Sequence, residues 1–214
     1  MSQSRRTRVQ RLPERGVYER TEIERILDAG LTCHVGYVVD DQPFVTPTAY
    51  WRTGDRLYWH GSSASRMLRQ LAAGVAACVT VTHVDGLVLA RSAYHHSMNY
   101  RSVMALGTAY PLLDREERLA ALHAFMERVA PGRWQEVRPP SEGELTATTV
   151  MWMSLDEASA KVRTGPPLDD EADYALTCWA GVLPMTTCVH PPSADPRLLA
   201  ATAEPAYLRT LRLG

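Results

Sequence analysis

Three apolar segments joined by two short turns constrain the fold of this chain more than any other feature. They read LTCHVGYVV, PFVTPTAYWR and RLYWHG, with DDQ and TGD between them. Turns this short connect strands that run antiparallel. Four more segments of the same kind follow, namely VAACVTVTHV, LVLARSA, NYRSVMALGTAYPL and TTVMWMSLD, the first two separated by a DG turn. A sheet of six or seven such strands has edges that need closing, so we expect a small β-barrel in a mainly β (α+β) chain.

Helices are expected in the connections between these strands. Thr21 with Glu24 has the spacing of a capping box, and SSASRMLRQLAAG is typical of a capped helix that ends at glycine. Asp114 with Glu117 begins a strongly amphipathic pattern, and DYALTCWAGVLPM is predicted as a short helix. We therefore divide the chain into an N-terminal arm (1–20), one domain (21–185) and a C-terminal tail (186–214).

Composition excludes several classes of protein. The 214 residues include 23 basic and 24 acidic ones, whereas nucleic-acid binders usually carry a basic excess. The N-terminus lacks the apolar stretch of a signal peptide, and no segment approaches the ~18 apolar residues of a membrane span. The four cysteines form no CxxC pair, which favours free thiols in a reducing compartment over a Cys178–Cys188 disulfide. We expect a cytoplasmic protein that binds neither nucleic acid nor membrane.

Most common catalytic signatures are absent from the sequence. The histidines show neither HxH nor HExxH spacing, so no metal site is expected. GxSxG, GxGxxG and the P-loop pattern are also missing, which disfavours a hydrolase and the familiar dinucleotide and nucleotide folds.

One segment, LYWHGSSASRML, has the composition of an anion site. Small hydroxyl residues follow the end of a strand, and a helix then begins with an arginine in its first turn. Backbone N–H groups, hydroxyls and a guanidinium together suit a phosphate monoester. Ordinary helix capping beside a surface arginine is the alternative interpretation.

Three further features suggest a planar ligand. In PFVTPTAYW, threonines flank a proline and would offer backbone groups to a heterocycle, unless this is only a bulged edge strand. NYRS places a dense polar group at the start of an otherwise apolar strand, where it could also be simply solvated. Trp134 lies in a polar loop and is the least core-like of the five tryptophans, so an interface or stacking role is an alternative to ordinary packing there.

Several of these segments occur in a fixed order along the chain. After the first helix they are CHVGYV, QPFVTPTAYWR, GDRLYWHGSSASRML, DGLVLARSAYHHSMNYRSVMALGTA, PGRW and SAKVRTGPP. In this order and spacing they resemble the pyridoxamine 5′-phosphate oxidase-related proteins, in the branch of flavin-nucleotide-binding and nitroimidazole-resistance-type proteins, over roughly residues 10–185. The resemblance implies a six- to seven-stranded antiparallel split β-barrel, and a homodimer with FMN between its two subunits.

The resemblance also assigns residues to the flavin. Those expected at the phosphate are Ser62, Ser65, Arg66 and Met67. Those expected along the isoalloxazine are Thr46, Pro47, Thr48 and Ala49, with Trp59 and His60 beside them. Those expected as a polar segment, which the partner subunit could supply, are Asn99, Tyr100, Arg101 and Ser102, with Trp134 closing the site.

Two residues are candidates for a direct chemical role. Lys161 is the only lysine in the chain, and its ammonium could reach a flavin oxygen, although a surface position is the alternative. His60 is the candidate proton donor because histidine titrates near neutral pH. The chain lacks the C-terminal Trp and Arg–His cluster that holds the substrate in authentic pyridoxamine phosphate oxidases, so vitamin B6 oxidation is not expected.

Three functions remain open at this point. The first is an FMN-dependent oxidoreductase that reduces a small electrophile such as a nitroaromatic or a quinone. The second is a non-catalytic protein that stores flavin or senses its redox state. The third is a binder of another planar cofactor, such as haem or a deazaflavin, for which His60 or His95 could serve as an axial ligand.

Overall fold

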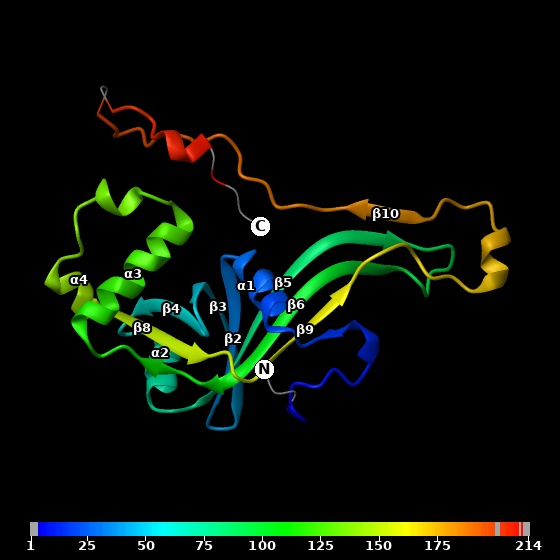
Figure 1. Ribbon diagram of the computed structural model, residues 1–214, viewed down its shortest axis with the longest axis horizontal. Coiled ribbons are helices and arrows are strands. Elements are labelled where there is room, and N and C mark those ends of the chain that lie inside the picture. The colour runs from blue at the N-terminus through cyan, green and yellow to red at the C-terminus, as the bar shows by residue number, and fades with distance from the viewer. Residues whose placement is uncertain (1–3, 200–201, 210, 212–214) are drawn as a thin grey trace.

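A single antiparallel sheet, curled into an open barrel, forms the body of the molecule (Figure 1). The computed structural model describes residues 4–199, 202–209 and 211. Within that part of the chain the sheet has ten strands in the order β1-β9-β6-β5-β2-β3-β4-β8-β7, and β10 pairs with β5. The predicted mainly β (α+β) split barrel is therefore confirmed.

The elements follow one another as short hairpins with helices in the longer connections. The strands are β1 (Gly16–Val17), β2 (Thr32–Val39), β3 (Gln42–Thr53), β4 (Arg56–Ser62), β5 (Ala76–Leu89), β6 (Ser97–Thr108), β7 (Tyr110–Pro111), β8 (Thr148–Ser154), β9 (Ala158–Arg163) and β10 (Gly181–Pro184). The α-helices are α1 (Arg20–Asp28), α2 (Arg66–Ala72), α3 (Arg115–Val129) and α4 (Glu142–Ala147). The 3-10 turns are η1 (Pro13–Arg15), η2 (Arg133–Gln135), η3 (Glu171–Ala175) and η4 (Ala206–Arg209).

The barrel is split along β3. Residues 42–49 of β3 pair with β2, whereas only residues 50–53 pair with β4. Beyond that point β4 leaves β3 and continues along β8. Residues 42–49 of β3 therefore have one edge without a strand partner, and a split opens between them and the end of β4.

The barrel interior is filled by alternate residues of the strands, as period-2 alternation requires. Cys33 and Val35 of β2, Val79 of β5 and Trp59 of β4 all belong to this core. α1 covers one end with Ile23, Ile26 and Leu27, and α2 contributes Met67, Leu68 and Leu71. A second cluster lies on the outside of β4 and β8, where Trp51 and Val150 pack against Phe125 of α3.

β5 and β6 extend well beyond the barrel (Figure 1). We call this extension the arm; it is separate from the N-terminal arm of residues 1–20. The DG at residues 85–86 is not the predicted turn, because β5 runs continuously through it with a bulge between Val84 and Gly86. The bulge inserts one residue, so Leu87 pairs with Met98 while Val84 pairs with Tyr100. Because β6 has no bulge, Leu87 and Val84 lie on the same face of the sheet.

The arm is completed by the chain that follows β9. β10 adds to the distal half of β5, with Leu183 opposite Leu87 and Gly181 opposite Leu89. Between β9 and β10 the chain folds back along the arm, where Asp169 accepts hydrogen bonds from the backbone and the guanidinium of Arg91. The short helix predicted from DYALTCWAGVLPM is wrong, since this stretch forms the end of η3, a loop and β10.

The helix caps give a mixed result. Asp114 accepts a hydrogen bond from the Glu117 backbone, which confirms the predicted start of α3, and Ser141 with Glu144 forms a full capping box. The Thr21–Glu24 box is wrong, because α1 begins at Arg20 and its N-cap is Glu19, two residues before Thr21. α3 is half-buried along most of its length, with Ala121 as its buried residue, and lacks the strongly apolar face predicted for it.

Two further expectations concern the whole chain. All four cysteines are free, Cys33 buried and Cys178 and Cys188 exposed, so the alternative disulfide does not form. Among the described residues, no helix combines the length and the apolar character that crossing a membrane requires.

Candidate cofactor site

The split between β3 and β4 brings together the residues predicted for a phosphate and a ring. Thr46 and Thr48 are half-buried, and each pairs with a β2 residue, Val35 or Cys33, whose side chain lies in the core. The Arg66 guanidinium lies 4.0 Å from the centre of the Phe44 ring. In the part of the chain that the structure describes, no carboxylate pairs with Arg66. Its positive charge is therefore available to an anion at the split.

The hydroxyl groups of the SSAS segment lie beside this arginine. Ser65 is the N-cap of α2, but its side chain makes no capping hydrogen bond. Ser62 accepts a hydrogen bond from the Ala64 backbone and is exposed. The Ser65 hydroxyl therefore does not cap the helix. The interpretation of this segment as an anion site stays open.

Pro47 and Ala49 lie on the other face of β3. Both are exposed, and they pair with His34 and Thr32 of β2. They therefore contribute to the outer surface of the barrel rather than to the split. Val45, on the same face, is 67% exposed.

A hollow of about 410 Å³ lies between the outer face of β4 and the α3–η2–α4 segment. Most of its lining is apolar, and the residues are His60, Leu122, Met126, Trp134, Val137, Arg138, Pro140, Glu144, Leu145 and Thr148. Concave, mainly apolar sites with a few polar groups are typical of cofactor binding. The structure thus brings His60 and Trp134, which are 74 positions apart in sequence, to one site.

His60 is one of four polar residues that line this hollow, with Arg138, Glu144 and Thr148. Its ring is 4.9 Å from that of Phe125 in an edge-to-face arrangement and 5.7 Å from that of Trp51. Its Nδ1 atom is buried and finds no hydrogen-bond partner among the described residues. Burial lowers the pKa of His60, because the charged imidazolium loses its hydration. A neutral imidazole in an apolar hollow is the form that coordinates a metal.

Trp59 and Met67 lie elsewhere. Trp59 is fully buried in the barrel core, and Met67 is nearly so. Neither side chain is available to stack on a ligand in this structure. The alternation along β4 explains this placement, since Leu57 and Trp59 point inward while Tyr58 and His60 point outward.

The polar NYRS segment lies on the arm and not at the split. Asn99 is buried, accepts a hydrogen bond from Arg163 and donates one to the Gly165 carbonyl at 3.1 Å. Arg101 forms a two-point ion pair with Asp85, at 2.9 and 2.8 Å. Tyr100 and Ser102 lie on the opposite face of β6, half-buried, and the Ser102 hydroxyl donates to the Lys161 carbonyl.

Lys161 lies on β9, next to β6. Its Nζ donates a hydrogen bond to the Arg11 carbonyl at 3.0 Å, beside a small hollow beneath residues 7–11. Two strands, β5 and β2, separate β6 from β3 in the sheet. At ~4.8 Å per strand, the NYRS segment is roughly 14 Å from Thr46–Ala49 within one chain.

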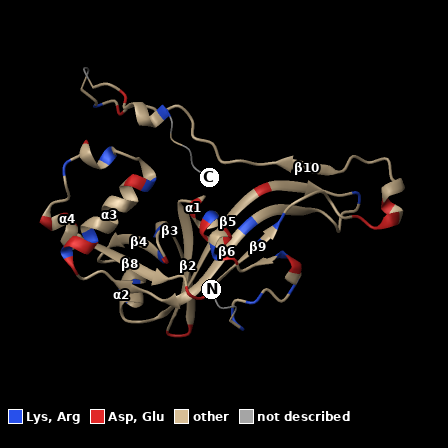
Figure 2. Cartoon of the chain, viewed as in Figure 1, with Lys and Arg blue, Asp and Glu red and all other residues tan. Residues whose placement is uncertain are grey.

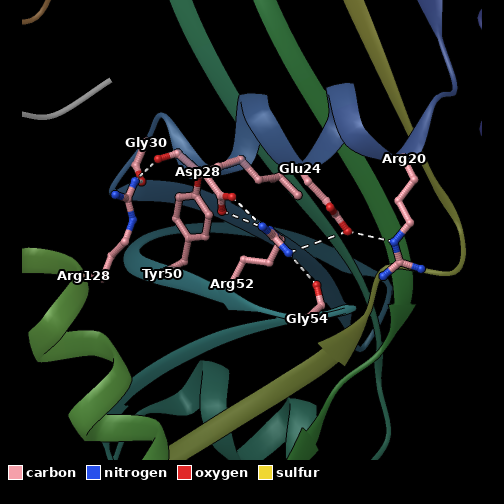
Figure 3. Close-up of polar contacts among 9 residues, drawn as sticks. Arg20, Glu24, Asp28, Gly30, Tyr50, Arg52, Gly54 and Arg128 are labelled. Carbon is pink, nitrogen blue, oxygen red and sulfur yellow. Dashed lines mark hydrogen bonds and ion pairs between the residues drawn. The ribbon is translucent and has the colours of Figure 1, made fainter.

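A charge network that the sequence did not reveal ties α1 to the barrel (Figure 3). Arg52 of β3 pairs with Asp28, Nε to Oδ1 at 3.0 Å, approaches Glu24 at 3.6 Å, and donates to the Gly54 carbonyl at 2.6 Å. Arg20, Glu24 and Asp28 are spaced four residues apart along α1, so the sequence already indicates that they lie on one face of the helix. Arg52, the partner of Glu24 and Asp28, comes from a different element and leaves no such pattern.

The end of α1 is also held by polar contacts from two other elements (Figure 3). Arg128 of α3 donates to the carbonyls of Asp28 and Gly30, and the Tyr50 hydroxyl donates to the Leu27 carbonyl. Burial raises the pKa of Tyr50, so its hydroxyl remains a donor.

An antiparallel barrel opened along one strand, with a polar split on one side and an apolar hollow on the other, is a split β-barrel. Its sequence matches the pyridoxamine 5′-phosphate oxidase family over residues 19–162. This chain therefore belongs to the pyridoxamine 5′-phosphate oxidase family, as the sequence motifs predicted. None of the curated proteins matches it.

Solved structures add more specific relatives. The flavocytochrome Anf3 from Azotobacter vinelandii is 47% identical, with 99% of this chain and 98% of that chain covered and a TM-score of 0.94. The FAD and heme binding protein from Mycobacterium smegmatis is 35% identical, with 92% and 96% covered and a TM-score of 0.88. A putative 5-nitroimidazole antibiotic resistance protein from Bacteroides thetaiotaomicron is 23% identical over 69% of this chain and 86% of that chain, with a TM-score of 0.56, and shares the fold.

Proposed function

We propose that this chain is an electron-transfer protein that holds a flavin at the split and a haem in the hollow lined by His60. The observation that carries the proposal is His60 itself, a half-buried imidazole with an unpartnered Nδ1 in a mainly apolar hollow. Two relatives with 92% or more of this chain covered support it, a flavocytochrome and a protein that binds FAD and haem.

The residues present fit both groups. Arg66, which has no carboxylate partner in the described chain, would face a flavin phosphate, and Thr46 and Thr48 would offer hydroxyls at the split. His60, kept neutral by burial, would coordinate iron in its hollow. The other candidate ligand, His95, lies near the tip of the arm, 3.5 Å from Asp170, and does not line this hollow.

The two groups define the chemistry. When bound, a flavin supplies hydride or single-electron exchange and a haem supplies single-electron exchange. The chain's own contribution is to separate these two sites on opposite sides of β4, to hold the imidazole deprotonated, and to exclude water from the hollow with Leu122, Met126 and Trp134.

The form of the flavin is part of the proposal. FMN, which we expected from the motifs, and FAD share the phosphate and the ring that the split would receive. We propose FAD, because the relative from Mycobacterium smegmatis is an FAD and heme binding protein and has 92% of this chain covered. Chromatography of the cofactor released by acid distinguishes the two, and FMN as the released compound would overturn this choice.

We also propose that the functional unit is a homodimer. The chain exposes 13,256 Å², whereas a compact chain of 23.8 kDa exposes about 9,900 Å². Such an excess is typical of a protomer that buries surface against a copy of itself. A second copy would also bring a polar NYRS segment to the split, which its own NYRS segment does not reach.

The proposal extends to the location of the protein and to its reaction. Four free thiols support a cytoplasmic location. Reduction of a small electrophile, such as a quinone or a nitroaromatic, would make the protein an oxidoreductase, whereas storage of electrons would not. Stopped-flow reoxidation of the reduced holoprotein separates the two, because storage predicts no acceptor faster than dissolved oxygen.

Absorption spectroscopy tests the central claim. The protein, purified or reconstituted with haem and FAD, should show flavin bands together with a Soret band. His60→Ala should lose the Soret band and keep the flavin bands, while the matched variant His95→Ala should keep both. A wild-type protein without a Soret band after reconstitution, or a His60→Ala protein with an unchanged one, would overturn the haem site.

A further inference from the structure

A row of apolar side chains crosses one face of the arm. Met98 of β6, Leu87 of β5 and Leu183 of β10 are directly opposed across the three strands. The Trp179 indole packs over Gly181 of the same face, where an added Cβ would lie within 2.9 Å of the ring. All four side chains are between 39% and 66% exposed. We call these four residues the arm stripe.

The opposite face of the arm is already covered by the chain itself. Val88 is fully buried there, and Asn99 is 8% exposed beneath Arg163 and the Gly165 carbonyl. The arm stripe is therefore not exposed merely because the arm projects from the barrel, since the opposite face of the same arm is buried. One face of the arm is packed, and the other presents leucine, methionine and tryptophan to solvent.

The chain after β10 has the same character. Residues 185–199 are all exposed, and residues 174–194 contain no Asp, Glu, Lys or Arg (Figure 2). We call residues 185–199 the strap. The Met185 amide bonds to the Asp85 carbonyl at one end, and beyond the strap Tyr207 bonds to Glu136 at 2.7 Å. Between these anchors, the hydrogen bonds of the described residues stay within the segment itself.

Such a segment is unusual for a loop of one chain. Connections longer than about 12–15 residues without secondary structure are uncommon unless they serve a function. Pro191, Pro192 and Pro196 make this one stiff. In Figure 1 it runs from β10 back toward α3, apart from the barrel. An exposed, stiff segment whose charged residues are Asp195 and Arg197 alone, with Val189, Leu198 and Leu199 at its surface, is typical of a surface that a partner covers.

The arm stripe is continuous with the outer face of the barrel. The bulge at Asp85 keeps Leu87 on the same face as Val84, Thr82 and Thr80, and Thr80 pairs with His34 of β2, which in turn pairs with Pro47 of β3. On that face Val38 and Val45 are 52% and 67% exposed. One continuous face thus runs from β3, across the sheet, to the tip of the arm; it is apolar at both ends and carries Thr82, Thr80 and His34 between them.

We propose that the arm stripe and the strap clasp a second copy of this chain, with the stripe lying on the partner's outer β2–β3 face. This inference rests on the proposed homodimer and adds how the two copies hold one another. The surface excess of about 3,400 Å² over a compact chain is far larger than the ~800 Å² per partner of a standard interface. The stripe and the β2–β3 face belong to one continuous surface, which suits the self-complementary contact of a two-fold dimer.

The clasp makes Trp179 and Leu183 the anchors of the interface. Large apolar side chains at the centre of a desolvated patch carry most of the binding energy of an interface. Because Leu183 is about half exposed in one chain, a charge at this position costs the single protomer little. It would, however, be buried without a partner in the clasp.

Analytical ultracentrifugation of the full-length chain tests the clasp. Leu183→Lys and Trp179→Ala should each raise the dimer dissociation constant at least tenfold. The matched control Leu113→Lys, at an 83% exposed leucine before α3, should leave it unchanged. Val45→Lys, on the β2–β3 face that the stripe of the second copy would cover, should also raise this constant at least tenfold. Thermal melts of each variant at low concentration establish that the protomer remains folded.

The outcomes separate the clasp from the dimer. If Val45→Lys dissociates the protein and Leu183→Lys and Trp179→Ala do not, the dimer stands and the clasp is wrong. A monomeric wild type at micromolar concentration overturns both. Maleimide labelling of Cys188, in the strap, gives a second readout: its rate should rise at least fivefold on dilution to monomer. An unchanged rate across that dilution would contradict the clasp.

Discussion

The barrel and the arm use the same kinds of residue in opposite ways. In the barrel, Leu57 and Trp59 are completely buried, whereas Leu183 and Trp179 on the arm are 48% and 66% exposed. Both regions are antiparallel sheet with alternating faces, so the difference does not arise from the strands themselves. The barrel closes on its own apolar face, with α1 and α2 covering its ends. The arm is covered on one face only, so the apolar residues of its other face stay exposed in a single chain.

Truncating one leucine in the barrel and one on the arm tests this comparison most directly. Leu57→Ala should lower the free energy of unfolding of the protomer by about 2–5 kcal/mol, since it leaves a cavity in the core. Leu183→Ala should lower it by less than ~0.5 kcal/mol. Urea denaturation, at a protein concentration below the dissociation constant of the proposed dimer, measures both losses. Equal losses would mean that Leu183 is packed within its own chain, which would contradict the contrast between the two regions.

Arg163, at the junction of barrel and arm, gives the next largest effect. It is 6% exposed and donates hydrogen bonds to Asn99 and to the Gly165 and Pro166 carbonyls, all neutral acceptors. Arg163→Met should cost about 2–4 kcal/mol, because it leaves buried acceptors unsatisfied. Hydrogen exchange should localise the loss to residues 86–90 and 97–99. Faster exchange in β3 and β4 to the same extent would show that the arm and the barrel do not open separately.

Arg52 tests how firmly α1 is attached to the barrel. Its side chain is 17% exposed and contacts Asp28, Glu24 and Gly54. Arg52→Met should destabilise the protomer by about 1–2 kcal/mol. The Arg20 side chain, which pairs with Glu24, is 44% exposed, so Arg20→Met should cost less than ~0.5 kcal/mol. Thermal melts at low and high salt measure both, and a larger loss for Arg20 would contradict this ranking.

The smallest effect is the pH dependence that His60 confers on the barrel. Its folded pKa is lowered by burial, so the unfolded chain binds the proton more readily. Stability is therefore fully present above the unfolded pKa of about 6.5 and falls as the pH drops toward the folded pKa, by less than the one-proton limit of ~1.4 kcal/mol per pH unit. His60→Phe should flatten this part of the profile, measured by urea denaturation between pH 7.5 and 5. An unchanged slope would mean that the imidazole is hydrated.

The sequence predicted the elements whose signals are local. β2, β3 and β4 were predicted because hairpins place partner strands next to one another in the chain. β1, β9 and β10 were not predicted as strands, because their pairs join distant segments, such as Gly16 with Lys161 and Gly181 with Leu89. Asp85-Gly86 was misread as a turn because a bulge and a hairpin favour the same two residues.

The candidate site was predictable where motif and strand alternation agree. His60 faces outward into the hollow, and its role stays a prediction. Trp59, one residue earlier, faces the core, which the alternation of β4 could have indicated. Asn99 and Arg101 have partners, Arg163 and Asp85, that only the folded arm brings to them. The order of the motifs predicts which segments contribute to the site. The face of a strand on which each residue lies depends on the register of that strand.

The bulge at Asp85 has a consequence for how the start of the strap is anchored. Deleting that single residue would leave Gly86 opposite Asn99 and Leu87 opposite Met98, so it would restore a regular ladder with β6 and leave both faces of the arm as they are. It would, however, remove the carboxylate that pairs with Arg101 and the carbonyl that accepts a hydrogen bond from the Met185 amide. The extra residue on β5 therefore serves as a fastening point for β6 and for the strap, and the faces of the arm do not depend on it.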